Sequence, residues 1–215
     1  MRVIKVNLLG DYTEALKKAV IVLRKGGTVV YPTDTVYGIG CNALDWKAVE
    51  TVYRIKERAL DKPMLVIARD LDWIKELALV PIKLEPILEK LWPGAITVIL
   101  PKKPIIPPIV TAHSPNVGIR IPNYELTDKL MLKFGYPLIS TSANLAGEGD
   151  EAYDIGKVLA QFKDKMWQPD LVLDAGKLLP SSSSTIIDFS SVKPKIVRLG
   201  AVNPKQLGIV IDHLS

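Results

Sequence analysis

The sequence predicts a mixed α/β sheet rather than a barrel, on three observations. Runs of β-branched and apolar residues alternate with segments of helical periodicity along most of the 215 residues. Near the C-terminus, apparent strands follow one another with only a loop between them. A content of 48% hydrophobic and 24% charged residues is typical of a globular protein that buries a sizeable core. No internal repeat is evident, so we expect a single domain over residues 1–215.

The expected strands are short apolar runs, most of them rich in Val and Ile. They cover residues 2–6, 28–31, 64–68, 95–100, 116–122, 137–140, 171–175, 184–189 and 195–199. The Pro-rich stretch from Pro101 to Pro115 is expected to form a loop.

The expected helices show apolar residues at helical spacing and carry start or stop signals at their ends. They cover residues 11–25, 46–56, 71–78, 82–91, 127–134, 154–162 and the start of the tail at 203–211. Asp11 and Glu14 have the spacing of a capping box, and Asp45 can cap the second helix. Gly135 ends the fifth helix, and Pro204 suits the first turn of the last one.

Charge, cysteine content and run length limit the classes of function. The net charge of +5 and pI of about 9.1 suit an anionic partner such as a nucleotide, phosphate or RNA, provided that the cations are clustered. With Cys41 as its single cysteine, the chain can form no intrachain disulfide and no multi-cysteine metal site. Apolar runs fall far short of the roughly 20 residues that cross a bilayer, and the N-terminus lacks a signal-peptide core, so we expect a cytoplasmic protein.

Polar and charged side chains gather at five expected ends of strands and helices. The stretches are "YPTDTVYG", "KERALDKP", "IRIP", "STSAN" and "PSSSST". Ligands of open α/β sheets bind where loops leave the strand ends. These stretches are therefore the candidates for a functional site.

Each of these stretches also has a structural explanation. Asp34 in "PTDT" can cap a Pro-initiated turn, which is the favoured explanation when that stretch is taken alone. Arg120 lies in an apolar stretch, so it occupies an exposed strand edge or faces a fixed anion in a cleft. Arg54, Lys56, Arg58 and Lys62 lie at or just after the C-terminal end of a helix, where cations offset the helix dipole by roughly 0.3–1 kcal/mol each. Once the chain leaves the helix they could instead grip a polyphosphate.

Two hydroxyl-rich segments are equally open to both explanations. The "STSAN" segment, residues 140–144, follows an apolar run and forms either a turn with a helix cap or a surface that holds a polar ligand. The serine-rich residues 181–184 form either a loop that closes on substrate or a flexible linker.

Several catalytic templates are absent from the sequence. A Ser-His-Asp arrangement needs a usable histidine, but His113 lies in the Pro-rich loop and His213 lies two residues from the end. No GxxxxGK[ST] phosphate loop and no dinucleotide fingerprint is present. Cations and hydroxyls without a protein nucleophile favour substrate positioning and charge stabilisation over covalent catalysis.

Taken together, six ordered motifs resemble those of the YrdC-like threonylcarbamoyl-AMP synthases. The motifs are "GGTVVYPTDTVYGIGCNA", "IKERALDKPM", "LWPGAITVIL", "VGIRIP", "PLISTSANLAG" and "SSSSTIIDF" followed by "IVRLGAV". They span the chain from about residue 26 to residue 202. The resemblance implies a twisted open α/β sheet around a large basic cavity. It also implies that L-threonine, bicarbonate and ATP are joined, with a divalent cation such as Mg²⁺, into threonylcarbamoyl-adenylate plus pyrophosphate.

The same resemblance implies two sets of site residues, and its metal ligands stay unknown. Those expected to bind ATP are Lys56, Arg58, Lys62, Asn116, Ser142, Asn144 and Arg198, with Lys56 and Arg58 on the phosphates as the catalytic pair. Those expected to line the threonine site are Thr33, Thr35, Arg120, Ser140 and Ser184, with Arg120 paired to the amino-acid carboxylate. The product would pass to the machinery that places threonylcarbamoyl on adenosine 37 of tRNA.

The chain departs from longer members of that family in two ways. Many of them carry a histidine shortly after the proline of the "KP" segment, where this chain has "PMLVIA". They also add a linker and a second domain, whereas this chain resembles the short class. Two alternatives remain. The first is a non-catalytic RNA-binding module that binds double-stranded RNA or tRNA, although this sequence lacks the interleaved aromatics of a stacking platform. The second is a carbamoyl transferase of hydrogenase maturation, but those proteins usually carry zinc-finger domains, which a chain with one cysteine does not contain.

Overall fold

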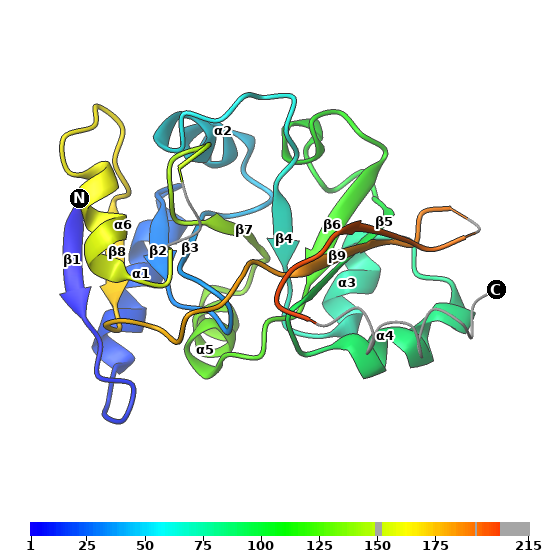
Figure 1. Cartoon of the computed structure of the whole chain (residues 1–215), viewed down its shortest axis with the longest axis horizontal. Coiled ribbons are helices and arrows are strands. Elements are labelled where there is room, and N and C mark those ends of the chain that lie inside the picture. The colour runs from blue at the N-terminus through cyan, green and yellow to red at the C-terminus, as the bar shows by residue number, and fades with distance from the viewer. Residues whose placement is uncertain (149–151, 192, 203–215) are drawn as a thin grey trace.

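A ten-stranded mixed sheet forms the framework of the protein. A computed structural model describes residues 1–148, 152–191 and 193–202. Its strands are β1 (Arg2–Lys5), β2 (Val29–Tyr31), β3 (Gly38–Gly40), β4 (Leu65–Ile67), β5 (Ile96–Pro101), β6 (Asn116–Arg120), β7 (Leu138–Ser142), β8 (Leu171–Asp174), β9 (Thr185–Asp188) and β10 (Lys195–Arg198). Their spatial order is β1-β8-β2-β3-β7-β4-β6-β5-β9-β10, and Figure 1 shows the first six of these strands in this order from the left. Parallel and antiparallel pairs both occur, for example β1 with β8 and β5 with β6, which confirms the predicted class.

The helices agree with the predicted ones except near their ends and in two short turns. They are α1 (Thr13–Arg24), α2 (Trp46–Ile55), α3 (Leu71–Leu77), α4 (Glu85–Leu91), α5 (Glu125–Phe134) and α6 (Ile155–Phe162), with 3₁₀ turns η1 (Ile82–Leu84) and η2 (Pro108–Thr111). The predicted helix over 82–91 is therefore split, and the Pro-rich loop contains a turn. The helix expected at 203–211 lies outside the described residues. No helix in the described ranges is long and apolar enough to cross a membrane.

The helix starts confirm one predicted cap and correct another. Asp45 accepts hydrogen bonds from the backbone N–H groups of Lys47 and Ala48 at the start of α2. At α1 the Asp11 carboxylate accepts from Thr13 N. Glu14 pairs with Lys17 at 2.6 Å instead of reaching back to the helix start, so the predicted capping box is wrong. A lysine one turn along the helix competes successfully for that carboxylate.

Successive residues of each strand belong to different hydrophobic clusters, because side chains alternate between the two faces of a sheet. In β2, Val30 packs in a cluster with α2, α3, α4 and α6, whereas Val29 and Tyr31 pack in a cluster with α1 and α5. In β7, Ile139 belongs to the former cluster and Leu138 to the latter. The helices α1 and α5 therefore share one face of the sheet.

Strand β3 was not predicted from the sequence. Two of its three residues are glycines, which are disfavoured in strands, so no β-propensity marked it. A Cβ on Gly40 would lie 1.9 Å from the carbonyl oxygen of Ile139, so this glycine allows a close backbone approach, and a Cβ on Gly38 would lie 3.0 Å from the side-chain Oγ of Ser140. Glycine here lets β3 fit between β2 and β7.

Gly40→Ala is expected to destabilise the fold by more than about 2 kcal/mol, because the added methyl group meets backbone rather than a movable side chain. Denaturant unfolding would measure the change. Gly156→Ala is the matched control, since its Cβ meets only the end of the Asp154 side chain, at 3.3 Å. Equal stability of the two variants would contradict the close approach.

Candidate functional site

A cavity of about 530 Å³ lies on the face of the sheet that α1 and α5 cover only in part. Its floor contains a row of cross-strand neighbours that are paired from β7 through β4, β6 and β5 to β9. These are Ser140, Leu65, Gly118, Ile99 and Asp188. The intervening residues of the same strands, such as Ile139, Val66 and Ile119, pack in the core on the opposite face. Strand alternation thus separates the cavity from the core.

Most of the predicted site residues line this one cavity, although they come from distant parts of the chain. They are Thr33, Thr35, Arg58, Lys62, Asn116, Arg120, Ser140, Ser142, Ser184 and Arg198. Lys56 and Asn144 are not among the lining residues, although both are buried beside it. Met64, which follows the "KP" proline, lines the cavity and is 2% exposed.

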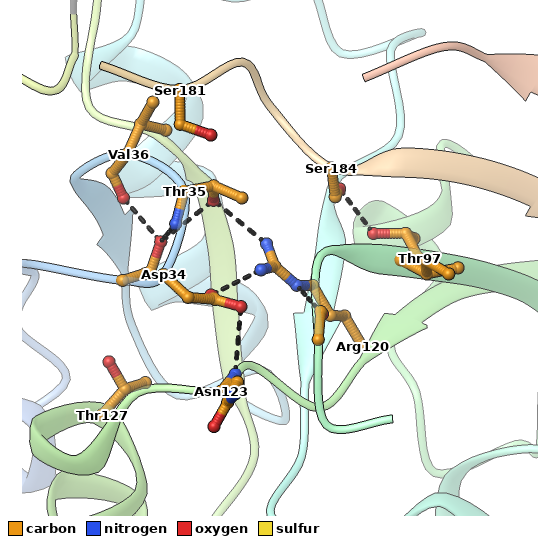
Figure 2. A network of polar contacts seen from close by, with 12 residues as sticks. Asp34, Thr35, Val36, Thr97, Arg120, Asn123, Thr127, Ser181 and Ser184 are labelled. Carbon is orange, nitrogen blue, oxygen red and sulfur yellow. Dashed lines mark hydrogen bonds and ion pairs between the residues drawn. The ribbon is translucent and has the colours of Figure 1, made fainter. Parts of the chain in front are cut away.

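Arg120 lines the cavity and is held by two segments of the chain, one of which contributes both Asp34 and Thr35 (Figure 2). Its Nε donates to the carbonyl of Gly94 at 2.8 Å, and one terminal nitrogen donates to Thr35 Oγ1 at 3.1 Å. The other terminal nitrogen forms an ion pair with Asp34. Burial lowers the pKa of Arg120, and the Asp34 carboxylate opposes that shift. The sequence left open whether Arg120 occupies an exposed strand edge or faces an anion in a cleft, and the structure shows the second arrangement, with Asp34 as the anion.

The "PTDT" turn is held to this network through its hydroxyls and its carboxylate. Thr33 Oγ1 donates to the Val36 carbonyl at 2.7 Å and lies 3.1 Å from Thr35 Oγ1. Asp34 Oδ2 accepts from the backbone N–H of Asn123 at 3.1 Å. The stretch therefore bends and lines the cavity, but the predicted cap by Asp34 is wrong, because the Asp34 carboxylate pairs with Arg120 and accepts from Asn123 instead.

A second set of hydroxyls lies on the other side of Arg120 (Figure 2). Ser184, 3% exposed, has its Oγ 2.8 Å from Thr97 Oγ1. Arg198 donates to the Ser184 carbonyl at 2.7 Å, which joins β10 to the end of the serine-rich loop. Ser183 also lines the cavity, and its carbonyl accepts from Ala201 N. These bonds tie the end of the serine-rich stretch to β10 and to residues just after it.

Lys56 binds the "STSAN" segment through backbone carbonyls, without itself lining the cavity. Its Nζ lies 2.5 Å from the carbonyl oxygens of Ser142 and Asn144 and 3.4 Å from Asn144 Oδ1. Ser142 Oγ donates to the same Asn144 Oδ1. The next helix, α6, is capped by Asp154, so "STSAN" caps no helix among the described residues. A buried cation thus fixes the loop that presents Ser142 to the cavity.

The chain turns sharply between Lys56 and Arg58, which separates these two cations. Glu57 has a left-handed φ of 49°, and the helix α2 has ended by this point. Arg58 then lines the cavity and donates to the carbonyls of Lys62 and Pro63. Lys56 is 2% exposed, so burial, followed by the nearby charge of Arg58, lowers its pKa to about 7. The two cations that the sequence grouped therefore have different surroundings.

Two acidic residues of the site were not singled out from the sequence. Asp34 was considered as a cap and not as the partner of Arg120, and only the fold could bring these two residues together. Asp188 lines the cavity, and period-two alternation from Ile186 would have placed it on that face. Within the described ranges, no group of three or more His, Cys, Asp or Glu side chains could hold a metal ion.

Comparisons with known proteins give one family. The model for Sua5, YciO and YrdC proteins, described as "Telomere recombination", matches residues 21–200. A putative threonylcarbamoyl-AMP synthase of Methanocaldococcus jannaschii is 36% identical over 210 residues, which is 96% of each chain. The threonylcarbamoyl-AMP synthase of Pyrococcus abyssi is 30% identical over 193 residues.

The solved structures include a close match in fold. The crystal structure of Pyrococcus abyssi Sua5 complexed with L-threonine gives a TM-score of 0.91 at 28% identity and covers 98% of this chain. The present chain spans only 61% of that structure and 56% of the curated Pyrococcus abyssi sequence.

The lowered pKa of Lys56 predicts a pH-dependent stability. Because the folded-state pKa of about 7 lies below the ordinary value of 10.5, the unfolded chain binds more protons between these pH values. The free energy of unfolding should therefore rise with pH across this window, by up to about 1.4 kcal/mol per pH unit, relative to Lys56→Met. Denaturant titrations of both proteins at several pH values measure the difference, and a flat difference would contradict the lowered pKa.

Proposed function

The chain belongs to the Sua5/YciO/YrdC family, and we therefore propose that it is a threonylcarbamoyl-AMP synthase. It would join L-threonine, bicarbonate and ATP, release pyrophosphate, and supply the threonylcarbamoyl group for adenosine 37 of tRNA. One observation carries the proposal: a single cavity joins a hydroxyl- and guanidinium-rich part to a part lined by Arg58, Lys62 and Arg198. The names of its relatives support this function over a non-catalytic RNA-binding module.

The two parts of the cavity suit the two larger substrates. Threonine would bind among the hydroxyls around Arg120, and the complex of a solved relative with L-threonine supports this assignment. ATP would bind across the other part, because Arg and Lys side chains there suit phosphate oxygens. The residues proposed to face the nucleotide are Arg58, Lys62, Asn116, Ser142 and Arg198.

Lys56 and Asn144 are buried and do not line the cavity, so they would act on the residues that do. Their mutual contact and the Lys56 bonds to the loop carbonyls support a positioning role for both residues. Direct contact of Lys56 with phosphate, which the family resemblance implies, stays a prediction, since in this structure Nζ lies against carbonyl oxygens instead.

The proposed reaction needs no nucleophile from the protein. The threonine amine attacks the carbon of bicarbonate and water leaves, which gives a carbamate. A carbamate oxygen then attacks the α-phosphate of ATP, and pyrophosphate leaves with the electrons of the broken P–O bond. The task of the protein is to bring anions together against their repulsion and to align them, which its fixed cations and N–H donors can do.

The donor set is compatible with Mg²⁺ that arrives with ATP. Mg²⁺ in nucleotide sites is usually bound by one or two carboxylates together with substrate phosphates. Asp188 supplies a carboxylate on the cavity wall. When bound, Mg²⁺ would neutralise part of the phosphate charge. We also propose that the protein acts in the cytoplasm.

The protein should release pyrophosphate from ATP and Mg²⁺ only when both L-threonine and bicarbonate are present. A coupled pyrophosphate assay, with each component omitted in turn, measures this dependence, and mass spectrometry identifies the adenylate. Pyrophosphate release that is independent of threonine or bicarbonate would overturn the proposed function.

Arg58→Ala should raise the KM for ATP by about tenfold or more, because it removes a charged donor from the phosphate part of the cavity. Arg54→Ala is the matched control, since Arg54 pairs with Glu50 on the exposed surface of α2. An equal effect of both substitutions would indicate a general loss of positive charge rather than a specific phosphate contact.

A further inference from the structure

The hydroxyls of Thr33 and Thr35 form a hydrogen-bond chain whose direction can be worked out from its two ends. Thr33 Oγ1 lies 2.7 Å from the carbonyl oxygen of Val36, which can only accept, so Thr33 donates its single hydroxyl proton there. The contact of 3.1 Å between the two threonine hydroxyls must then use the proton of Thr35. The chain therefore runs from Thr35 to Thr33 to Val36.

With this direction, Thr33 Oγ1 has no hydrogen-bonding capacity left, whereas Thr35 Oγ1 can still accept one hydrogen bond. Thr33 Oγ1 accepts from the Thr35 hydroxyl and from the Thr35 backbone N–H at 3.2 Å, which uses both of its lone pairs. Thr35 Oγ1 donates to Thr33 and accepts from Arg120 at 3.1 Å. One lone pair of Thr35 remains, and Thr35 lines the cavity. Toward a ligand, Thr35 is therefore a hydrogen-bond acceptor and not a donor.

The Arg120 guanidinium enforces this direction, because it can donate and never accept. Its approach to Thr35 depends on two other bonds, from Nε to the Gly94 carbonyl and from a terminal nitrogen to Asp34. The side chains of Arg120 and Asp34 are only 8% and 15% exposed. At this depth an unpaired guanidinium would be costly, so Asp34 stabilises Arg120 in this position.

Asp34 also connects the arginine to the surrounding backbone. Its second oxygen accepts from Asn123 N, in the segment that leads from β6 to α5. Thr127 in α5 donates to the carbonyl of Pro32 at 2.8 Å, directly before Thr33 in the chain. The turn that carries Thr35 is therefore held both through the Asp34 carboxylate and through the Pro32 carbonyl.

We propose that Asp34 is a positioning residue: it holds Arg120 against Thr35, and thereby makes Thr35 Oγ1 the acceptor for the side-chain hydroxyl of the amino-acid substrate. The assignment of that ligand as a hydroxyl amino acid rests on the proposed function. An acceptor at this point favours a ligand hydroxyl over the methyl group of an isosteric aliphatic amino acid, because the methyl group would leave the buried lone pair unpaired.

The first experiment tests the positioning without any substrate. Hydrogen exchange of the Arg120 Nε–H, followed by NMR in the free protein, should accelerate about tenfold or more in Asp34→Asn and much less in Asp34→Glu, which keeps the charge. Asp128→Asn is the matched control, because Asp128 pairs with Arg69 at 2.9 Å elsewhere in the fold. Unchanged Arg120 exchange in a folded Asp34→Asn would overturn the positioning role.

The second experiment tests the consequence for selectivity. Calorimetry should show that Asp34→Asn and Thr35→Val each weaken L-threonine binding about tenfold or more while changing L-valine binding much less. The affinity for a non-hydrolysable ATP analogue and the melting temperature serve as controls for the rest of the site. An unchanged threonine-to-valine ratio in Thr35→Val would overturn the assignment of Thr35 as the hydroxyl acceptor.

The two experiments separate this inference from the proposed function. If the wild-type protein binds no threonine but its Arg120 exchange responds to Asp34→Asn, the proposed function fails and the positioning role stands. If threonine binds and neither readout responds, the positioning role fails and the proposed function stands.

Discussion

The alternation of side chains between the two faces of the sheet is the constraint on which the rest of the structure depends. One face carries an apolar core that continues from Val30 in β2 to Ile187 in β9. Burial of that face fixes the register, because a slip by one residue would turn its side chains to the other face. The residues between the core positions must then face the other way. Where α1 and α5 do not cover them, these residues line the cavity.

Two buried cations, Lys56 and Arg120, fix the loops that surround the cavity. Lys56 and Arg120 are 2% and 6% exposed, and a buried charge is tolerated only when it is paired or fully hydrogen-bonded. Lys56 meets this requirement with oxygens of the "STSAN" segment, and Arg120 meets it with Asp34, Thr35 and Gly94. Loops that would otherwise sample many conformations are thereby tied to the framework before a ligand arrives. Such pre-organisation lowers the entropic cost of assembling several substrates.

Local sequence signals predicted most elements of the fold and misjudged those that depend on neighbours. Apolar runs located nine of the strands, and Asp45 marked the start of α2, because these signals act within a few residues. Strand β3 escaped prediction because Gly40 is required by the close approach of the Ile139 backbone, a contact between segments about a hundred residues apart. The capping box at α1 failed because Glu14 pairs with Lys17 instead. The residues that line the cavity were largely identified through the ordered family motifs rather than through local propensity.

By itself, the sequence determined the class of fold, the family motifs and the chemical types of the site: cations and hydroxyls, without a histidine base or a phosphate loop. Only the tertiary structure decided how these groups are used. It separated Lys56 from Arg58 at the left-handed Glu57, and it paired Arg120 with Asp34 across 86 positions of the chain. The physical reason is that hydrogen-bond direction and the pairing of buried charges depend on which segments meet in space. Composition and spacing do not contain that information.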